Sequence, residues 1–420
     1  MKKLSSILTF LGIVSAFSLT SCSNSTPSDN VDEDKEIVLK FWNGFTGADG
    51  NSMKEIVNSF NKEYTGKIKI EADTINWDSL FLKLIQNKGK PKFSPHIVAM
   101  GANRLGQMQS KGIIREINDI ESYLEVSKTD YLNAAWDAGM FDGKRYSFPL
   151  DMHPTAMYYN KDLISESELP STWEEFETIC KAKTKNGVYG WAIPNMYSIT
   201  KDIVYSMALQ NGSDLLNSTN APTFNDSTWV NALSKIYNWK YVDKISPESV
   251  GASGDLTLFN TGKSVFYFDG PWTINTMKDI SPVDFGVAPM PGSVGNNATS
   301  FAGSHQFTLV DCTTKDEKIK EACYTFINYV NRNPLEWAKA GQVTSYLPVH
   351  ETAEYEELVE LQPFTEEAST AKIGNVTYEY FYEAYNYMGS AVANCLNNQG
   401  DATSCLNEKV NLFNKFLKEQ

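Results

Sequence analysis

Aromatic and carboxylate side chains occur together at two points where predicted strands begin or end. Trp272 and Asp269 follow a strand predicted over 264–268, and Asp151 and His153 precede another strand. A flat aromatic ring packs on the apolar C–H face of a pyranose, and a carboxylate accepts strong hydrogen bonds from its hydroxyl groups. Together these groups are typical of a sugar-binding site. Two alternatives remain open: Trp272 could pack in a core, and the carboxylates could bind backbone N–H groups at a hinge.

A glycine-rich loop at 43–50 provides another set of polar groups. It lies between an apolar segment at 37–42, which we expect to be a buried strand, and a helix predicted at 53–60. Glycines allow a ligand to approach the backbone, and the first turn of a helix has free N–H donors. The loop also contains side chains that can bind hydroxyl groups: Asn43, Thr46 and Asp49. We expect it to contact a ligand; the alternative is a plain turn that starts a helix.

Further candidates for a ligand-binding role are single residues near predicted loops. Trp42 ends the first strand, Trp77 precedes a helix, and Asn195 follows a strand of the second half. His305 precedes a strand, and Tyr346 lies in a later turn. The alternatives are a core position for Trp42 and a packing contact at the start of a helix for Trp77.

The sequence predicts no metal site and no cofactor. The four histidines are scattered, and although His153 and His305 could meet across a cleft, zinc would need further ligands at fixed spacing. Residues 262–264 (Gly-Lys-Ser) resemble the end of a phosphate-binding loop, but Thr257 replaces its first glycine, and the predicted strand follows the motif. We therefore expect no ATP hydrolysis.

No catalytic residues are predicted either. A surface glycoside hydrolase is the enzymatic alternative, and it would need two carboxylates that flank the scissile bond. Asp49, Asp151 and Asp269 are the available groups, but no pattern marks one of them as a protonated acid. We therefore expect a protein that binds its ligand without changing it.

Strands and helices alternate along the chain, and this alternation must position the groups described above. Apolar segments at 67–72 and 96–100 predict further strands, and each precedes a segment with helical spacing. The alternation resumes after residue 151, where Thr172 and Glu175 have the spacing of a capping box. The pattern predicts an α/β fold with a mainly parallel sheet, in which ligands bind at the carboxyl ends of the strands.

The N-terminal segment has the form of a secretory signal. Two lysines precede an apolar segment at 4–19, and residues 19–22 (Leu-Thr-Ser-Cys) resemble the lipobox of bacterial lipoproteins. We expect residues 1–21 to be removed, Cys22 to be acylated, and the acidic residues 22–35 to form a flexible tether. The alternatives are an ordinary signal or a single membrane helix, for which the apolar segment is short.

Three segments resemble the extracellular solute-binding proteins of bacterial ABC importers, in the sugar-binding group that includes maltose-binding protein. They are Phe148–Leu163, Gly262–Trp272 and Phe285–Gly292. The resemblance covers essentially the whole mature chain. It implies a two-lobe fold like that of type II periplasmic binding proteins, with discontinuous lobes, a hinge and a central ligand cleft. In this family, an aromatic residue at the place of Trp272 commonly packs against sugar.

The resemblance also implies domain limits and partners. The N-terminal lobe would comprise 36–149 plus 272–332, and the C-terminal lobe 150–271 plus 333–420. Such a protein is a monomer that captures a carbohydrate and delivers it to ABC permease subunits, which are separate chains. Its lipid anchor would hold it at the extracytoplasmic face of a membrane, in the periplasm or at the cell surface.

Charge narrows the class of ligand. The formal net charge is -14, which argues against nucleic acid, because nucleic-acid binding needs clustered basic residues. Some relatives that take phosphorylated or acidic solutes carry an arginine near a turn that corresponds to 340–348, and this segment has neither arginine nor lysine. We therefore expect a neutral sugar or oligosaccharide. A peptide, a polyamine or a sugar phosphate remains the alternative ligand.

Two pairs of cysteines are close enough in sequence to form disulfides outside the cytoplasm. Cys395 and Cys405 flank a predicted turn, and Cys312 and Cys323 could tie the end of a strand to the next helix. Cys180 would then be a small buried apolar residue. None of the spacings is typical of a metal or redox site.

Overall fold

The computed structural model describes residues 35–196, 199–295 and 298–420. The chain divides into residues 1–35 and the compact unit 36–420. The predicted signal peptide, Cys22 and nearly all of the tether lie outside the described residues. Within the described part, no helix combines the length and the apolar character that crossing a bilayer would require.

The first predicted strand, β1 (Ile37–Asn43), belongs to a five-stranded sheet with the order β2-β1-β3-β13-β6. β1 runs parallel to β2 (Ile68–Thr74) and β3 (Ile97–Gly101). β13 (His305–Leu309) runs antiparallel to β3 and to β6 (Phe148–Pro149). The parallel strands bring the loops after β1 and β3 to the same edge of the sheet, as the alternating pattern predicts.

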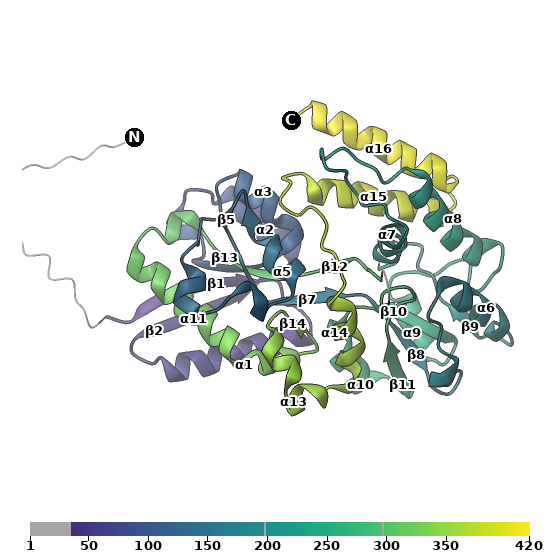
Figure 1. The fold of residues 1–420 in the computed structure, drawn as a ribbon, viewed down its shortest axis with the longest axis horizontal. Coiled ribbons are helices and arrows are strands. Elements are labelled where there is room, and N and C mark those ends of the chain that lie inside the picture. Colours follow the sequence, from purple (N-terminus) through teal and green to yellow (C-terminus); the bar gives the residue numbers. More distant parts are fainter. Residues whose placement is uncertain (1–34, 197–198, 296–297) are drawn as a thin grey trace, which may run out of the picture. The chain divides into compact units, whose positions relative to one another are not determined.

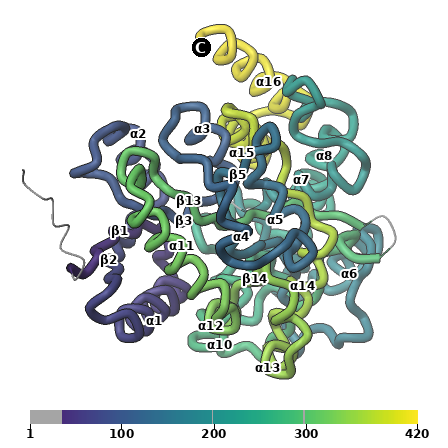
Figure 2. The backbone as a smooth tube through the Cα atoms, turned by 60° about the vertical axis from the view of Figure 1, so that its left-hand side comes forward, coloured from purple at the N-terminus to yellow at the C-terminus, as the bar shows by residue number. Residues whose placement is uncertain are grey.

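Helices α1 (Ala48–Glu63) and α11 (Glu317–Arg332) pack on this sheet (Figures 1 and 2). Aromatic side chains form part of the contact. The ring centroids of Phe60 and Phe326 are 5.1 Å apart, and Phe326 lies 5.4 Å from Phe41 of β1. All three rings are fully buried. Burial of large aromatic rings dominates the stability of such a core.

A second sheet has four strands in the order β11-β8-β10-β9. β8 (Ala156–Asn160) lies antiparallel between β10 (Ser264–Asp269) and β11 (Phe285–Ala288), and β9 (Tyr189–Trp191) runs parallel to β10. The sequence-based lobe limits placed 285–288 with the first sheet, whereas the pairing places it in the second. The reason is that β8 is an inner strand, whose second edge needs the backbone partner that β11 supplies.

Short strands lie between the two sheets. β7 (Asp151–Pro154) follows β6 of the first sheet and leads into β8 of the second, and it pairs on both sides with β12 (Ala302–Gly303) and β14 (Val343–Thr344). β12 leads from the second sheet back to β13 of the first. We propose that the chain returns between the lobes in the segment 289–304 rather than at 269–272; the lobe limits otherwise stay a prediction.

Helices from the end of the chain pack on helices that lie between strands β9 and β10 of the second sheet. α15 (Phe381–Leu396) lies against α16 (Ala402–Lys418) and α7 (Thr200–Gln210), and α16 also contacts α8 (Ser227–Tyr241) (Figure 1). α6 (Trp173–Lys183) begins with the predicted capping box, in which the Thr172 hydroxyl accepts from the Glu175 N–H.

The remaining elements are short. The helices are α2 (Trp77–Gln86), α3 (Leu105–Ser110), α4 (Ile120–Leu124), α5 (Asn133–Ala138), α9 (Gly254–Asn260), α10 (Ile274–Ile280), α12 (Pro334–Ala338), α13 (Ala353–Glu356) and α14 (Gln362–Ala368). Two strands, β4 (Met140–Phe141) and β5 (Lys144–Arg145), form a hairpin. The 3₁₀ turns are η1 (Pro91–Phe93), η2 (Ala102–Arg104), η3 (Lys128–Asp130), η4 (Glu166–Glu168), η5 (Pro271–Thr273), η6 (Asp311–Thr313), η7 (Leu347–Glu351) and η8 (Val359–Leu361).

The described cysteines are free thiols, so neither of the two possible disulfides is present in the structure. Cys312 packs against one hydrophobic core and Cys323 lies in the other, which keeps this pair apart. Cys395 and Cys405 do lie near each other across the turn between α15 and α16, where burial raises the pKa of both thiols. Cys180 is buried, as the sequence predicts.

Candidate functional site

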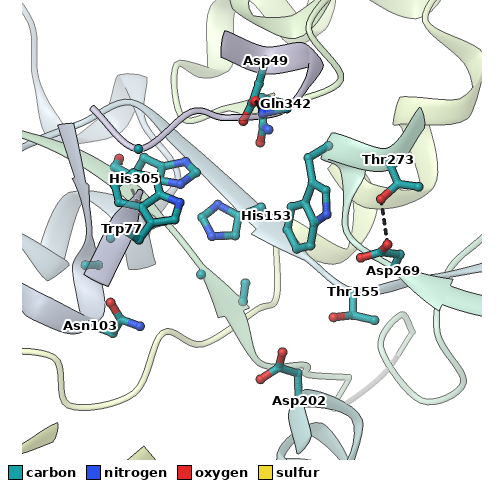
Figure 3. Close-up of a pocket in the computed structure, with 18 of the residues that line it drawn as sticks. Asp49, Trp77, Asn103, His153, Thr155, Asp202, Asp269, Thr273, His305 and Gln342 are labelled. Carbon is teal, nitrogen blue, oxygen red and sulfur yellow. Dashed lines mark hydrogen bonds between the residues drawn. The ribbon is translucent and has the colours of Figure 1, made fainter. Parts of the chain in front are cut away.

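A cavity of about 540 Å³ lies where the loops after β1 and β3 meet strand β7, strand β12 and the segment after β10 (Figure 3). Segments that are far apart in the sequence thus form its wall. The sequence-predicted residues that line it are Thr46, Asp49, Trp77, His153, Asp269, Trp272 and His305. The other predicted residues are Trp42, Asn43, Asp151, Asn195 and Tyr346, and these do not line it.

The loop after β1 forms one side of the cavity. Asn43 stabilises this loop, because its buried Oδ1 accepts hydrogen bonds from the Phe45 N–H at 3.2 Å and from the Thr74 hydroxyl at 3.2 Å. Asp49, at the start of α1, accepts through Oδ1 from the Gly50 N–H at 2.8 Å. Burial raises the pKa of Asp49 above its usual value, and His305 opposes this shift. Oδ2 of Asp49 has no hydrogen-bond partner within the described part of the chain and stays available to a ligand.

Four rings run across the cavity. Trp77 stacks on His305 with centroids 5.4 Å apart and an interplanar angle of 10°. His305 lies 4.4 Å from His153, and His153 meets Trp272 edge-on at 5.7 Å. Gly44 must be glycine here, because a Cβ at this position would lie 2.1 Å from the Trp77 ring. Two indole rings on opposite ends of a row of imidazoles can stack on the flat faces of a ligand.

Asp151 lies behind the two imidazoles and is fully buried. Its Oδ2 accepts from His305 Nδ1 at 2.9 Å and from Trp337 Nε1 at 2.9 Å, and its Oδ1 accepts from the His305 backbone N–H at 2.8 Å. His153 Nδ1 lies 3.3 Å from the same Oδ1. An ionised carboxylate can only accept hydrogen bonds, so the Nδ1 atom of each histidine carries a proton and donates a hydrogen bond to Asp151. Nε2 remains as the second hydrogen-bonding atom of each ring.

The charges of this group follow from its burial. Burial by itself would raise the pKa of Asp151, but the nearby His305 and the hydrogen bonds from both histidines hold it well below its usual value. Burial, followed by the neighbouring His305, lowers the pKa of His153. Asp151 is therefore a fixed negative charge that orients the imidazoles, while His153 stays neutral at pH 7.

Asp151, His153 and His305 are also the residues that could hold a metal ion, because their ligand atoms lie within 4.8 Å of one another. The observed contacts favour a different use. Both carboxylate oxygens already accept N–H groups, and both Nδ1 atoms face the carboxylate rather than a common point. A metal ion would have to replace several of these hydrogen bonds.

Asp269 supports the second tryptophan. Its Oδ1 accepts from the Gly270 N–H at 2.8 Å, and its Oδ2 accepts from the hydroxyls of Thr273 at 2.7 Å and Tyr267 at 2.5 Å. These bonds fix turn η5, which carries Trp272. Burial raises the pKa of Asp269. The carboxylate thus lines the cavity and also makes the backbone hydrogen bond that was the alternative interpretation.

Three of the predicted residues have roles away from the cavity. Trp42 is buried and donates through Nε1 to Asp73 at 3.2 Å, which matches the alternative of a core position. The Asn195 amide donates to the Leu396 carbonyl at 2.7 Å and so ties a loop to the end of α15. Tyr346 packs against Tyr131, with ring centroids 5.5 Å apart.

Sequence reasoning missed other residues of the wall. Asn103 follows β3, and the rule that ligands meet the carboxyl ends of strands would have found it. Asp202, near the start of α7, accepts from the Tyr385 hydroxyl and pairs with Lys201 at 3.2 Å. Gln342 lies in the turn before β14, where no local pattern distinguishes it. Of the described residues that line the cavity, none is lysine or arginine.

The model of the bacterial extracellular solute-binding protein family matches residues 55–363. The chain belongs to this family. A galactooligosaccharide-binding protein from Bacillus subtilis is 23% identical over 331 residues, which cover 74% of this chain and 73% of that protein. A maltooligosaccharide ABC transporter solute-binding lipoprotein from Streptococcus pneumoniae is 21% identical and covers 96% of this chain and 94% of its own length.

Solved structures of solute-binding proteins share this fold. An ABC substrate-binding protein from Listeria monocytogenes in complex with cycloalternan has a TM-score of 0.75 at 21% identity, covering 92% of this chain and all of that one. The sugar-binding protein MalE from Xanthomonas citri has a TM-score of 0.77 at 19% identity, covering 91% and 99%. These similarities confirm the predicted two-lobe fold of type II binding proteins. The names of these relatives describe binding proteins, and two of them name an ABC transporter or ABC substrate.

Proposed function

We propose that this solute-binding protein captures an oligosaccharide in the cavity between the two sheets and delivers it, unchanged, to an ABC permease. The observation that carries this proposal is the pair of indole rings, Trp77 and Trp272, in one cavity of about 540 Å³ with polar groups between them. A volume of this size is within the range of small-molecule sites. The ligands in the names of its relatives are also oligosaccharides.

The polar groups of the cavity match the hydroxyl groups of a neutral sugar. Asp49 provides an acceptor, and Asn103 provides both a donor and an acceptor. The two imidazoles are held in place by Asp151, so a ligand need not order them. Because no lysine or arginine is among the described residues of the wall, a phosphorylated or acidic solute would find no counter-charge.

Delivery requires motion and attachment. The lobes would close over the sugar by bending at the crossing segments, of which β7 is one. Acylation of Cys22 would hold the protein, as a monomer, at the extracytoplasmic face of the membrane. The permease and its ATPase would be separate chains.

A titration panel tests the proposal. The purified full-length protein, solubilised in detergent, would be titrated with maltotriose, maltotetraose, galactotriose, spermidine and a tetrapeptide, with tryptophan fluorescence and calorimetry as readouts. We expect saturable binding of at least one oligosaccharide and no binding of spermidine or peptide. Mass spectrometry of the sugar after overnight incubation should show no cleavage. Binding of spermidine or peptide alone would reject a carbohydrate ligand, and cleavage would reject a pure binding role.

A further inference from the structure

Gln342 is a buried amide without a hydrogen-bond partner. Its side chain is fully buried, yet neither Nε2 nor Oε1 is hydrogen-bonded in the described part of the chain. Buried polar groups are nearly always paired, because an unpaired amide has given up its bonds to water without replacement. Gln342 also lines the cavity, so its unpaired amide lies beside the space that a ligand would fill.

The backbone on both sides of Gln342 is fixed, so the amide does not reach the cavity by chance. Gly341 has a φ of +85°, and a Cβ there would lie 2.6 Å from the carbonyl oxygen of Pro271, beside Trp272. Val343, the next residue, pairs with Met152 of β7, the neighbour of His153. The turn thus places Gln342 between the segments that carry Trp272 and His153.

A second buried glutamine, whose amide is fully hydrogen-bonded, provides a comparison for Gln342. Gln306 of β13 is also fully buried, but its Nε2 donates to the Ala135 carbonyl at 3.0 Å and to the Ser304 hydroxyl at 2.8 Å. Its Oε1 accepts from the Ser147 hydroxyl at 2.9 Å. The fold therefore satisfies a buried glutamine where the amide has a structural role, and leaves one unsatisfied at the cavity.

We propose that Gln342 is a specificity-determining residue that forms hydrogen bonds with two neighbouring hydroxyl groups of a carbohydrate. One hydroxyl donates to Oε1 while the adjacent one accepts from Nε2, so the amide matches a vicinal diol. The proposal rests on the proposed function. Figure 3 shows Gln342 and Asp49 on the same side of the cavity, where the carboxylate can accept from a further hydroxyl.

This role has a consequence for selectivity. When a site is built to hydrogen-bond a hydroxyl, an analogue that lacks this hydroxyl leaves the buried partner unpaired and is strongly rejected. A sugar without the matching diol should bind poorly even if its ring stacks normally on Trp272. Selection by Gln342 should thus act on hydroxyl positions, whereas stacking acts on the flat face of the ring.

The test compares Q342M with the matched control Q306M in the full-length protein. Methionine has nearly the same length as glutamine and no hydrogen-bonding amide. We expect Q342M to keep or raise the melting temperature without ligand, because it removes an unpaired buried amide. Q306M should lower it by about 2 °C or more, since it leaves several partners unpaired. With maltotriose or galactotriose, the Kd of Q342M should rise by about 10- to 100-fold.

Monodeoxy analogues of the trisaccharide that binds provide the decisive readout. Removal of either of two adjacent hydroxyls should weaken binding to the unmodified protein by about 10-fold or more, and this loss should disappear in Q342M. The proposal is overturned if Q342M melts as early as Q306M, which would make the amide structural. It is also overturned if Q342M binds the trisaccharide within twofold of the unmodified protein.

Failure of the proposed function gives a different pattern. If the unmodified protein binds neither trisaccharide, the carbohydrate assignment fails, and the melting temperatures without ligand still decide the role of Gln342. An unchanged or higher value for Q342M then supports an amide reserved for a ligand, and a lower value rejects it.

Discussion

Trp77 and Trp272 line the same cavity but are held in different ways. The Trp77 ring stacks on His305, meets Phe45 edge-on at 5.7 Å, and lies against the backbone at Gly44. The Trp272 ring meets His153 edge-on and otherwise lies against Gly270, where a Cβ would approach it within 2.0 Å. Trp77 is thus packed against both hydrophobic cores, whereas Trp272 belongs to neither core and has His153 as its ring neighbour.

The carboxylates behind the two rings differ in the same way. Asp151 binds His305, which supports Trp77, and also Trp337, so it connects several elements. Asp269 makes its hydrogen bonds within the short segment that carries Trp272. One end of the cavity therefore depends on long-range contacts, and the other on a local turn. This difference suggests that stability and ligand affinity respond differently to substitutions at the two ends.

The largest expected effect is the loss of stability in D151A. Removing one member of a buried, hydrogen-bonded charge group leaves several N–H donors unpaired, so we expect the free energy of unfolding to fall by about 3–5 kcal/mol. Chemical denaturation monitored by circular dichroism would measure this change. D279A is a control at an exposed aspartate of α10 and should cost less than about 1 kcal/mol. Equal losses in the two variants would contradict the role assigned to Asp151.

The same carboxylate should also shape the response to acid. Because the pKa of Asp151 is lowered in the folded protein, its stabilising contribution is present above the unfolded value near 4. It is lost progressively as the pH falls below that value towards the folded pKa. The decline in melting temperature between pH 4 and pH 2 should therefore be shallower in D151N than in the unmodified protein. Parallel curves would argue against a lowered pKa.

We expect W77A to have an intermediate effect, mainly on the free energy of unfolding. Its half-buried ring packs against several neighbours, so we expect the free energy of unfolding to fall by about 2–3 kcal/mol, less than for a fully buried tryptophan. W77F should recover most of this loss. If W77A keeps its melting temperature and only weakens sugar binding, the two tryptophans act alike and the comparison fails.

We expect the smallest change in free energy for W272A, and this change should be mainly in the free energy of ligand binding. Loss of one stacking face should raise the Kd for the bound oligosaccharide by about 10- to 30-fold, which corresponds to about 1.4–2 kcal/mol. The melting temperature without ligand should change by less than about 2 °C. W272F should bind with intermediate affinity. Unchanged affinity in W272A, measured by calorimetry, would show that the ring does not stack on the sugar.

The two ends of the cavity also differ in how far they could be predicted. Trp272 was found from its place after a strand, because η5 continues directly from β10. Trp42 lies one residue before the end of β1, but its side chain is buried in the core and donates through Nε1 to Asp73. Successive side chains of a strand face opposite sides, and the sequence of a strand buried on both faces does not show which side faces the ligand.

The pairing of distant segments was a further limit. Phe285–Ala288 has the pattern of a buried strand, and the structure confirms a strand there. Its partner, β8, is more than a hundred residues earlier in the chain, so local sequence pointed to neither the partner nor the sheet. Gln342 was missed for the same reason, since its importance comes from unpaired amide atoms in a wall built by other segments.

Local patterns were sufficient for the alternation of strands and helices, the glycine loop after β1, the capping box of α6 and the family resemblance. Each of these depends on residues that are neighbours along the chain. The position of Asp151 behind two imidazoles and the placement of the unpaired Gln342 amide depend on contacts between segments more than a hundred residues apart. Burial and hydrogen-bond partners are properties of packed segments, so these features emerge when the chain is folded.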